Sequence, residues 1–254
     1  MPPRSREETE RLFVEAIAAL DRLDDKTRVE LLESSGWMHL VVRPSPALNG
    51  RLDDYFEWCS EKREENAGEL LEEIAYLLFQ SLVGVGNLRS FQSYAPQHDL
   101  VVDGESNNWI VLLEYLHLPK SGRSIVVECK NQDEQVSDQQ FSRLCGILQN
   151  KFQDTSHLGV FVSRTSATGF PKKPKRERSL RDARATQALF HAKTGKYVVV
   201  INHDDLIRMK QGANIAKILE AKIREVEASS GVALEFNNEW KEIVLPPHLA
   251  KHKV

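Results

Sequence analysis

The sequence predicts an α/β fold in which helices flank a mixed central β-sheet, preceded by a mostly helical N-terminal region. Two observations carry this prediction. The 254 residues are enough to bury one large core, or a core with an appendage. From about residue 67 onward, short β-branched runs alternate with segments of helical period. The sequence has no internal repeat, which argues against a barrel.

The N-terminal region shows apolar residues at helical spacing, and Ser5 with Glu8 forms a capping-box pattern. The expected helices are residues 5–25, 26–34 and 52–66. Between them, residues 37–42 predict a short strand, and the Pro, Ser, Asn and Gly content of residues 43–50 predicts a loop.

The second part begins with a strongly apolar helix over residues 68–84, with Leu71, Ile74 and Leu78 on its buried side. Strands are expected at residues 91–95, 98–104, 109–118, 124–130, 158–163 and 196–201. Further helices are expected at residues 137–152, with Ser137 or Asp138 as the N-cap, at 184–195, ending at Gly195, and over 203–229 as one or two helices. We therefore expect two domains, residues 1–66 and 67–254.

The net charge of −3 hides a local pattern. Residues 1–67 carry 15 acids and 10 bases, whereas residues 171–184 carry seven bases and two acids. A basic segment of this kind fits contact with a nucleic-acid backbone, and a solvated loop is the alternative. The residues expected to make that contact are Lys172, Lys173, Lys175, Arg176 and Arg178.

Several classes of protein are disfavoured. No apolar stretch approaches the roughly 20 residues that span a bilayer, and the N-terminus lacks the pattern of a signal peptide. Cys59, Cys129 and Cys145 have no zinc-site spacing and suggest no disulfide framework. We expect a cytoplasmic protein that makes no membrane contact.

The candidate catalytic and metal-binding residues are Asp99, Glu128 and Lys130. Glu128 and Lys130 lie two positions apart at the end of an apolar strand, so both side chains project from one face, where burial is costly without partners. Asp99 opens another apolar strand, and it converges on Glu128 if the two strands pair. Two convergent carboxylates suit Mg²⁺, with Mn²⁺ as an alternative. A lysine beside such a metal can hold a water for attack on a phosphodiester.

This arrangement resembles the D…(D/E)xK signature of the PD-(D/E)xK nuclease superfamily, with Asp99 as the first acid and Glu128, Cys129 and Lys130 as the ExK. It resembles in particular the Mrr-like restriction endonuclease branch of that superfamily. The resemblance covers about residues 67–210. In order, it matches a helix carrying a glycine and an acid, the acid strand, the ExK strand, a helix opening with Val-Ser, a strand entering a Ser/Thr-rich stretch, and a strand before an acidic helix start.

The resemblance implies a restriction-endonuclease-like core with named roles. Asp99 and Glu128 would bind the metal together with the Cys129 carbonyl, and Lys130 would position the attacking water. On the helix before the strands, Glu72, or its neighbour Glu73, would be an auxiliary acid. Gln140, or Gln139, matches a glutamine that some members carry after ExK. The long interval between Asp99 and Glu128 implies an extra strand or hairpin, and residues 1–66 match no part of the family.

The expected function is metal-dependent hydrolysis of DNA phosphodiester bonds, in prokaryotic defence by restriction or as an antiviral effector. The alternatives are a structure-specific DNA repair or junction nuclease, an RNA-cleaving relative, and a nucleic-acid-binding subunit of a defence complex that does not cut. The resemblance implies a dimer or higher homo-oligomer. Residues 1–66 are expected to dimerise, or to bind a protein or small-molecule activator.

Overall fold

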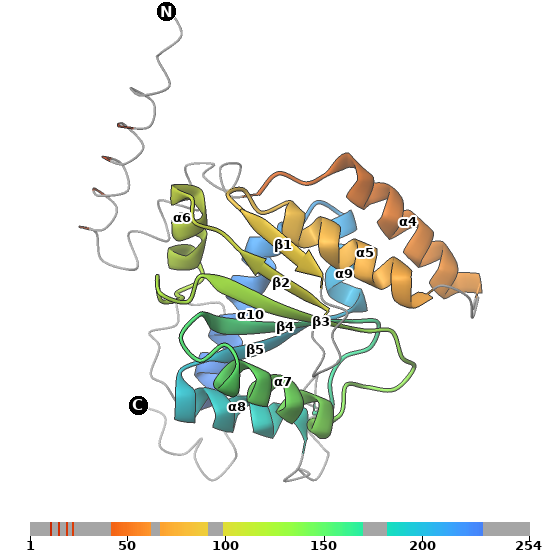
Figure 1. Cartoon of the computed structure of the whole chain (residues 1–254). Coiled ribbons are helices and arrows are strands. Elements are labelled where there is room, and N and C mark those ends of the chain that lie inside the picture. Colours follow the sequence, from red (N-terminus) through yellow and green to blue (C-terminus); the bar gives the residue numbers. More distant parts are fainter. Residues whose placement is uncertain are drawn as a thin grey trace, which may run out of the picture.

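The computed structural model describes residues 42–61, 67–90, 99–169 and 182–230, together with the single residues 11, 15, 19 and 22. Within this part of the chain, five strands form one sheet and seven helices surround it (Figure 1). The α/β class and the mixed sheet predicted from the sequence are confirmed. The predicted strand at residues 91–95 and most of residues 1–41 lie outside the described residues.

The sheet has the strand order β1-β2-β3-β4-β5. Its strands are β1 (Asn87–Ser90), β2 (Leu100–Asp103), β3 (Ser124–Lys130), β4 (Ser156–Ser163) and β5 (Tyr197–Ile201). β1, β2 and β3 pair antiparallel, whereas β3, β4 and β5 pair parallel. As a result, the carboxyl ends of β3, β4 and β5 share one edge of the sheet with the start of β2. The charged residues singled out in the sequence lie at this edge.

Helices cover both faces of the sheet (Figure 1). They are α4 (Pro46–Glu61), α5 (Ala67–Gln80), α6 (Asn107–Tyr115), α7 (Asp138–Asn150), α8 (Ala183–Thr194), α9 (His203–Lys210) and α10 (Ile215–Ser230). None of the helices in the described ranges is both long and apolar enough to cross a membrane.

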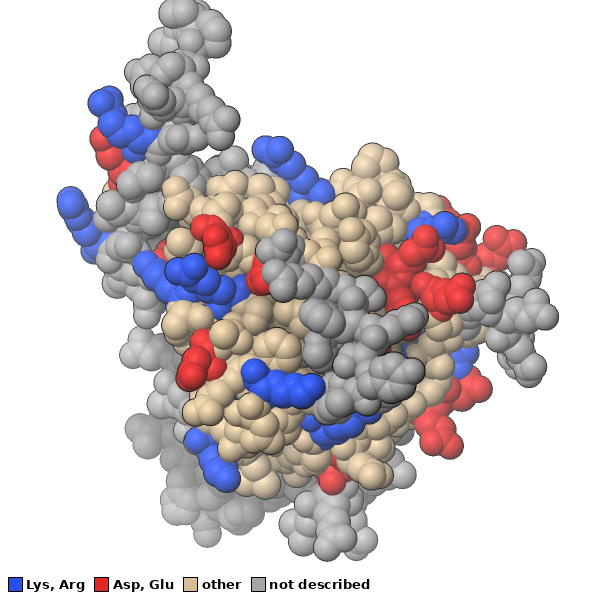
Figure 2. Space-filling model, in the orientation of Figure 1, with Lys and Arg blue, Asp and Glu red and all other residues tan. Residues whose placement is uncertain are grey.

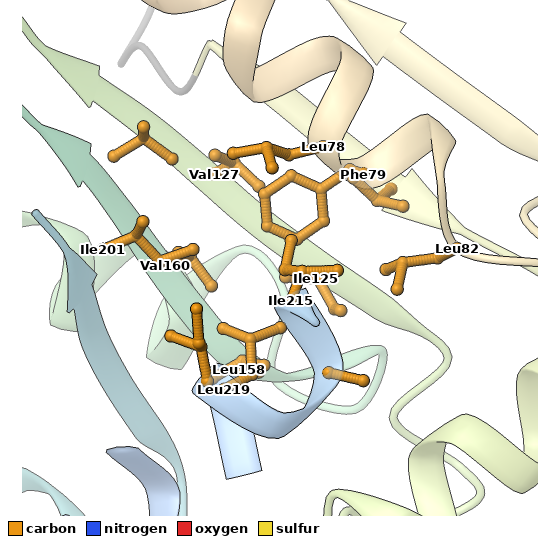
Figure 3. Packing of buried hydrophobic residues seen from close by; sticks show 14 of the residues in the cluster. Leu78, Phe79, Leu82, Ile125, Val127, Leu158, Val160, Ile201, Ile215 and Leu219 are labelled. Carbon is orange, nitrogen blue, oxygen red and sulfur yellow. The ribbon is translucent and has the colours of Figure 1, made fainter. Parts of the chain in front are cut away.

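Each face of the sheet has its own buried core. On one face, Ile125 and Val127 of β3 pack with α4, α5, α6, α9 and α10; Figure 3 shows Leu78 and Phe79 of α5 against these strand residues. On the other face, Val126 packs with Phe141 and Leu144 of α7 and with residues of α8. This alternation along β3 is the period of two expected of a strand covered on both sides.

Helix α4 belongs to the first of these cores, to which it contributes Leu48, Leu52 and Tyr55. The described end of the expected N-terminal domain therefore packs directly on the sheet domain. Residues 46–50, predicted as a loop, are the first turns of α4. Pro46 is compatible with the first turn of a helix because its missing N–H would have no intrahelical partner there. The Ser45 hydroxyl accepts a hydrogen bond from the Ala47 N–H at 3.3 Å.

The prediction of a strand at residues 109–118 is wrong, because this segment forms α6. Ser106 is the N-cap and accepts a hydrogen bond from the Trp109 N–H at 3.3 Å. Five residues of the helix are buried, so the apolar run has no visible 3.6-residue period. A continuous apolar run does not distinguish a buried strand from a buried helix. The long interval between Asp99 and Glu128 therefore holds a helix, and no extra strand or hairpin.

Candidate active site

Glu128 and Lys130 lie at the carboxyl end of β3, where the strand leaves the core. The five residues before Cys129, Ser124 to Glu128, are all buried, and Lys130 is half-buried. Both side chains project from the α7 face of the sheet, and the Lys130 Nζ lies 2.6 Å from the Glu128 Oε1. The predicted shared face is therefore confirmed. The end of the strand is also tied to β4, because the Lys130 carbonyl accepts a hydrogen bond from the Ser163 hydroxyl at 3.2 Å.

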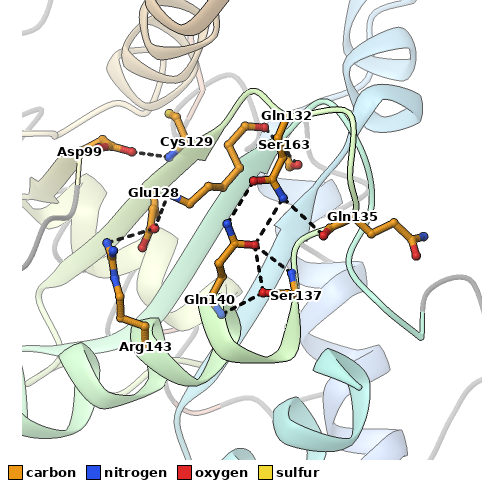
Figure 4. A network of polar contacts seen from close by, with 10 residues as sticks. Asp99, Glu128, Cys129, Gln132, Gln135, Ser137, Gln140, Arg143 and Ser163 are labelled. Atoms are coloured by element: carbon orange, nitrogen blue, oxygen red, sulfur yellow. Dashed lines mark hydrogen bonds and ion pairs between the residues drawn. The ribbon is translucent and has the colours of Figure 1, made fainter. Parts of the chain in front are cut away.

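Asp99 lies next to Glu128, as expected if β2 and β3 pair. It precedes Leu100, which pairs antiparallel with Val127. The Asp99 N–H donates to the Val127 carbonyl at 3.1 Å, and the Asp99 Oδ2 accepts a hydrogen bond from the Cys129 N–H at 2.5 Å. Asp99 is thus bound to the backbone on both sides of Glu128, and Figure 4 shows the contact with Cys129. These two backbone contacts fix the position of the Asp99 carboxylate relative to β3.

Glu128 is the most buried charged group of the cluster, with a relative exposure of 1%. Its Oε1 has two cationic partners, the Lys130 Nζ and the Arg143 guanidinium, whereas its buried Oε2 has no hydrogen-bond partner. Burial raises the pKa of the Glu128 carboxyl above its ordinary value, and the charges of Lys130 and Arg143 offset this only in part. Asp99 adds a smaller upward contribution. The unpartnered Oε2 is the oxygen of Glu128 on which a further cation could bind.

Glu72, on α5, is the acid of that helix that lies close to this cluster. Partial burial, and then the charges of Asp99 and Glu69, raise the pKa of the Glu72 carboxyl. Its neighbour Glu73 instead pairs with Arg51 of α4 at 3.0 Å. The geometry therefore favours Glu72 over Glu73 as an acid near the site.

The hydrogen bonds of Gln140 go to the start of its own helix and to Gln132. Its Oε1 accepts from the Ser137 N–H at 2.9 Å, which completes the capping box of α7. Its amide nitrogen donates to the Gln132 Oε1 at 3.0 Å. In Figure 4 this pair of glutamines lies between the end of β3 and the start of α7. The structure thus gives Gln140 a capping role, and its catalytic role stays a prediction. Gln139 is exposed.

Arg143 is the site residue that the sequence analysis missed. It lies on α7, and its Nη2 is 3.2 Å from the Glu128 Oε1. A signal was available in the sequence, because residue 143 is three positions after Gln140 and therefore lies on nearly the same face of a helix. The resemblance gives Gln140 a role in the site, so the same face of the helix points to Arg143 as a second candidate.

Cys129 projects from the opposite face of β3, as predicted, and packs at the margin of the first core. Burial, and then the charges of Asp99 and Glu72, raise the pKa of its thiol well above the ordinary value. The thiol is therefore neutral at physiological pH and is a poor nucleophile. The proposed role of the Cys129 carbonyl as a metal ligand stays a prediction.

The residues present fit a divalent cation in one specific way. No group of three or more His, Cys, Asp or Glu side chains in the described ranges is arranged to hold a metal. Asp99 and Glu128, however, supply two carboxylates, and the Glu128 Oε2 is buried and unpartnered. Mg²⁺ is commonly bound through one or two carboxylates, with waters and substrate oxygens completing its shell. The donor set fits a hard cation of this kind.

The surface around the site is divided by charge. Figure 2 shows acidic side chains gathered over the ends of α4 and α5 that lie next to each other. The exposed acids there are Asp53, Asp54, Glu57, Glu61, Glu69, Glu72 and Glu73. Lys130 and Arg143 project on the α7 side instead. The predicted nucleic-acid contacts Lys172, Lys173, Lys175, Arg176 and Arg178 lie outside the described residues.

Comparisons of this chain with protein-family models, with curated proteins and with solved structures found no match.

Proposed function

We propose that this protein is a metal-dependent endonuclease of the PD-(D/E)xK type that hydrolyses DNA phosphodiester bonds. The observation that carries the proposal is the arrangement of Asp99, Glu128 and Lys130. Residues about 30 positions apart in the sequence lie side by side at one edge of the sheet, with a lysine 2.6 Å from a buried carboxylate. The Glu128 carboxylate is 1% exposed, and one of its two oxygens has no hydrogen-bond partner. Burying a charge in this way is costly, and an ordinary surface ion pair does not require it.

The order of elements supports the same proposal. The resemblance predicts a helix carrying Gly68 and Glu72, then an acid strand, an ExK strand, a helix, and two further strands. The chain follows this order in α5, β2, β3, α7, β4 and β5. The segment opening at Val136 and Ser137 begins α7, and the segment after β5 begins α9 with a capping box of Asn202 and Asp205.

In this mechanism Asp99 and Glu128 would hold Mg²⁺, or Mn²⁺, which when bound would stabilise negative charge on a phosphoryl oxygen. Asp99 is held in place by the Cys129 N–H, and Glu128 by burial. The Lys130 ammonium, positioned by Glu128, would donate a hydrogen bond to the attacking water and orient its lone pair toward phosphorus. Glu72 would be an auxiliary acid beside Asp99.

The charge distribution indicates how a polyanion would approach. Exposed acids dominate the adjoining ends of α4 and α5, and they would repel a nucleic-acid backbone (Figure 2). Lys130 and Arg143 lie on the other face, beside α7. DNA would therefore reach the site from the α7 side. A defence role, a homo-oligomer and an activator bound by residues 1–66 are further predictions, which rest on the resemblance and the sequence.

The proposal is tested by cleavage of methylated and unmethylated plasmid DNA with Mg²⁺, with Mn²⁺ and with a chelator. Wild type is compared with Asp99→Ala, Lys130→Ala and the control Asp103→Ala, which changes an acid at the other end of the same strand. We expect metal-dependent cutting that both site variants lose and the control keeps. Binding of DNA without cutting by the wild type would instead favour the non-catalytic subunit, and preference for branched DNA the repair nuclease.

A further inference from the structure

Arg143 is a cationic partner of Glu128 for which the D…(D/E)xK signature has no place. Its Nη2 lies 3.2 Å from the Glu128 Oε1 (Figure 4), and the Lys130 Nζ lies 2.6 Å from the same oxygen. Two unit positive charges therefore share one carboxylate oxygen, while the other oxygen of that carboxylate has no hydrogen-bond partner. The two cations balance the charges of the two carboxylates, Asp99 and Glu128, without a metal, and a divalent cation bound there would leave an excess of positive charge.

The two cations differ in how easily they can leave Glu128. The side chain of Lys130 is 22% exposed and lies along β3, whereas that of Arg143 is 39% exposed and comes from α7. Arg143 can therefore turn into solvent without moving the strand. Its planar guanidinium also binds a phosphate through two parallel hydrogen bonds, which a lysine ammonium does not do.

We propose that Arg143 is an exchangeable counter-ion: it neutralises Glu128 in the metal-free protein and moves to a phosphate of the bound strand when a divalent cation occupies the carboxylates. The inference rests on the proposed function and deepens it, because it names the residue that couples metal binding to substrate binding. Arg143 and the cation repel each other, so each weakens the binding of the other at Glu128. A phosphate that captures Arg143 removes this competition.

Thermodynamic linkage makes the proposal measurable in the metal-binding equilibrium itself. Removing Arg143 removes the competitor, so Mn²⁺ should bind Arg143→Ala more tightly than wild type, by about tenfold, within the usual range of coupling between two sites. A residue that only holds Glu128 in place would have the opposite effect, because its loss would free the carboxylate and weaken Mn²⁺ binding. The direction of the change therefore separates the two roles.

The experiment is isothermal titration of Mn²⁺ into the full chain without DNA, for wild type, Arg143→Ala, Arg143→Lys and Lys151→Ala. Lys151 is the matched control, since it is an exposed cation at the other end of α7. We expect the largest gain in Mn²⁺ affinity in Arg143→Ala, a smaller gain in Arg143→Lys, and no change in Lys151→Ala. Thermal unfolding of each variant checks that it is folded, and Arg143→Lys serves as the readout if Arg143→Ala is not.

A second arm measures the binding of a short DNA duplex by fluorescence anisotropy with Ca²⁺ in place of Mg²⁺. We expect Arg143→Ala to bind the duplex about tenfold more weakly than wild type, a larger loss than that of Lys151→Ala. Unchanged or weaker Mn²⁺ binding by Arg143→Ala would overturn the exchange and leave the nuclease proposal standing. A wild type that binds no Mn²⁺ would contradict the proposed function itself.

Discussion

Replacing Glu128 with glutamine should stabilise the metal-free protein. Glu128 is 1% exposed, and burial raises the pKa of its carboxyl above the ordinary value although two cations contact it. A raised pKa means that the folded protein holds the charged form less favourably than the unfolded chain does. The glutamine side chain has nearly the same shape and carries no charge to desolvate.

The magnitude follows from which of two effects dominates. Removing one member of a buried ion pair usually costs about 3–5 kcal/mol, because the partner is left charged and buried. Here the partners reach water, since the side chains of Lys130 and Arg143 are 22% and 39% exposed. Replacing a buried ion pair by neutral groups of similar volume is often neutral or stabilising, by about 1–4 kcal/mol. Because only the carboxylate is replaced here, we expect the lower part of that range, about 1–2 kcal/mol in unfolding free energy. For a chain of this size, that gain raises the Tm by roughly 2–8 °C.

The assay is thermal unfolding of wild type and Glu128→Gln in a chelator, at neutral pH and at pH 4. Because the folded pKa of Glu128 lies above its unfolded value, the wild type binds the proton more tightly when folded. Its stability from this group therefore falls as the pH rises from the ordinary pKa through the raised one. The advantage of glutamine should be present at neutral pH and absent below the ordinary pKa. A Glu128→Gln protein that unfolds several degrees below wild type in the chelator would refute this reasoning.

Three other residues allow equally direct tests of the fold. Lys196 is buried, and its Nζ donates to the carbonyls of Leu148, Phe152, Gln153 and Ser156 at 2.5–3.0 Å. Lys196→Met should therefore lower the unfolding free energy, measured by chemical denaturation, by about 3–5 kcal/mol. The control Lys193→Met, at an exposed position, should change it by less than about 0.5 kcal/mol. A Cβ on Gly104 would lie 2.5 Å from the Gly84 carbonyl oxygen and 2.7 Å from the Trp109 ring. Gly104→Ala should therefore lower the unfolding free energy by about 2–3 kcal/mol. Gly146→Ala, at an open position within α7, should raise it by up to about 1 kcal/mol. Equal effects of the two substitutions would contradict this packing. Ser137→Ala removes the N-cap of α7 and should lower the unfolding free energy by about 1 kcal/mol, and an unchanged denaturation midpoint would show that the cap contributes nothing.

Elements with a strong local signal could be predicted from the sequence. β3 was expected at residues 124–130 and has those bounds, because its β-branched run is bounded by a turn and by charges. Helix α7 begins after Ser137, one of its two expected caps, and α8 ends at Gly195, which adopts the left-handed conformation at φ 68°. In each case the signal lies in residues at, or directly next to, the ends of the element.

Elements whose conformation depends on distant contacts could not be predicted. The apolar run around Trp109 becomes a helix because Ser106 caps it and because both its sides are covered, which no local period shows. β1 was missed since it has four residues, Asn87–Ser90, and only its pairing with β2 defines it. The start of α4 at Pro46 has the sequence pattern of a loop, because proline is common both in the first turn of a helix and in turns between elements.

The candidate site shows the same division. Asp99, Glu128 and Lys130 could be placed together because strand periodicity fixes which face a side chain takes, and the structure confirms that placement. Arg143 and the capping role of Gln140 depend on how α7 docks against β3, which is a tertiary property. The sequence therefore predicted the charges that the strands carry, and missed the one that a neighbouring helix supplies.

The measurement that tests the central claim most directly is single-turnover cleavage of labelled duplex DNA by wild type and Glu128→Gln, with Mg²⁺ and with a chelator. Glu128→Gln is suited to this because it should be folded and at least as stable as wild type, so lost activity cannot be ascribed to unfolding. We expect cleavage by the wild type with Mg²⁺ only, and none by the variant. Cleavage by the wild type in the chelator, or undiminished cleavage by Glu128→Gln, would contradict a metal-dependent site built on Asp99 and Glu128.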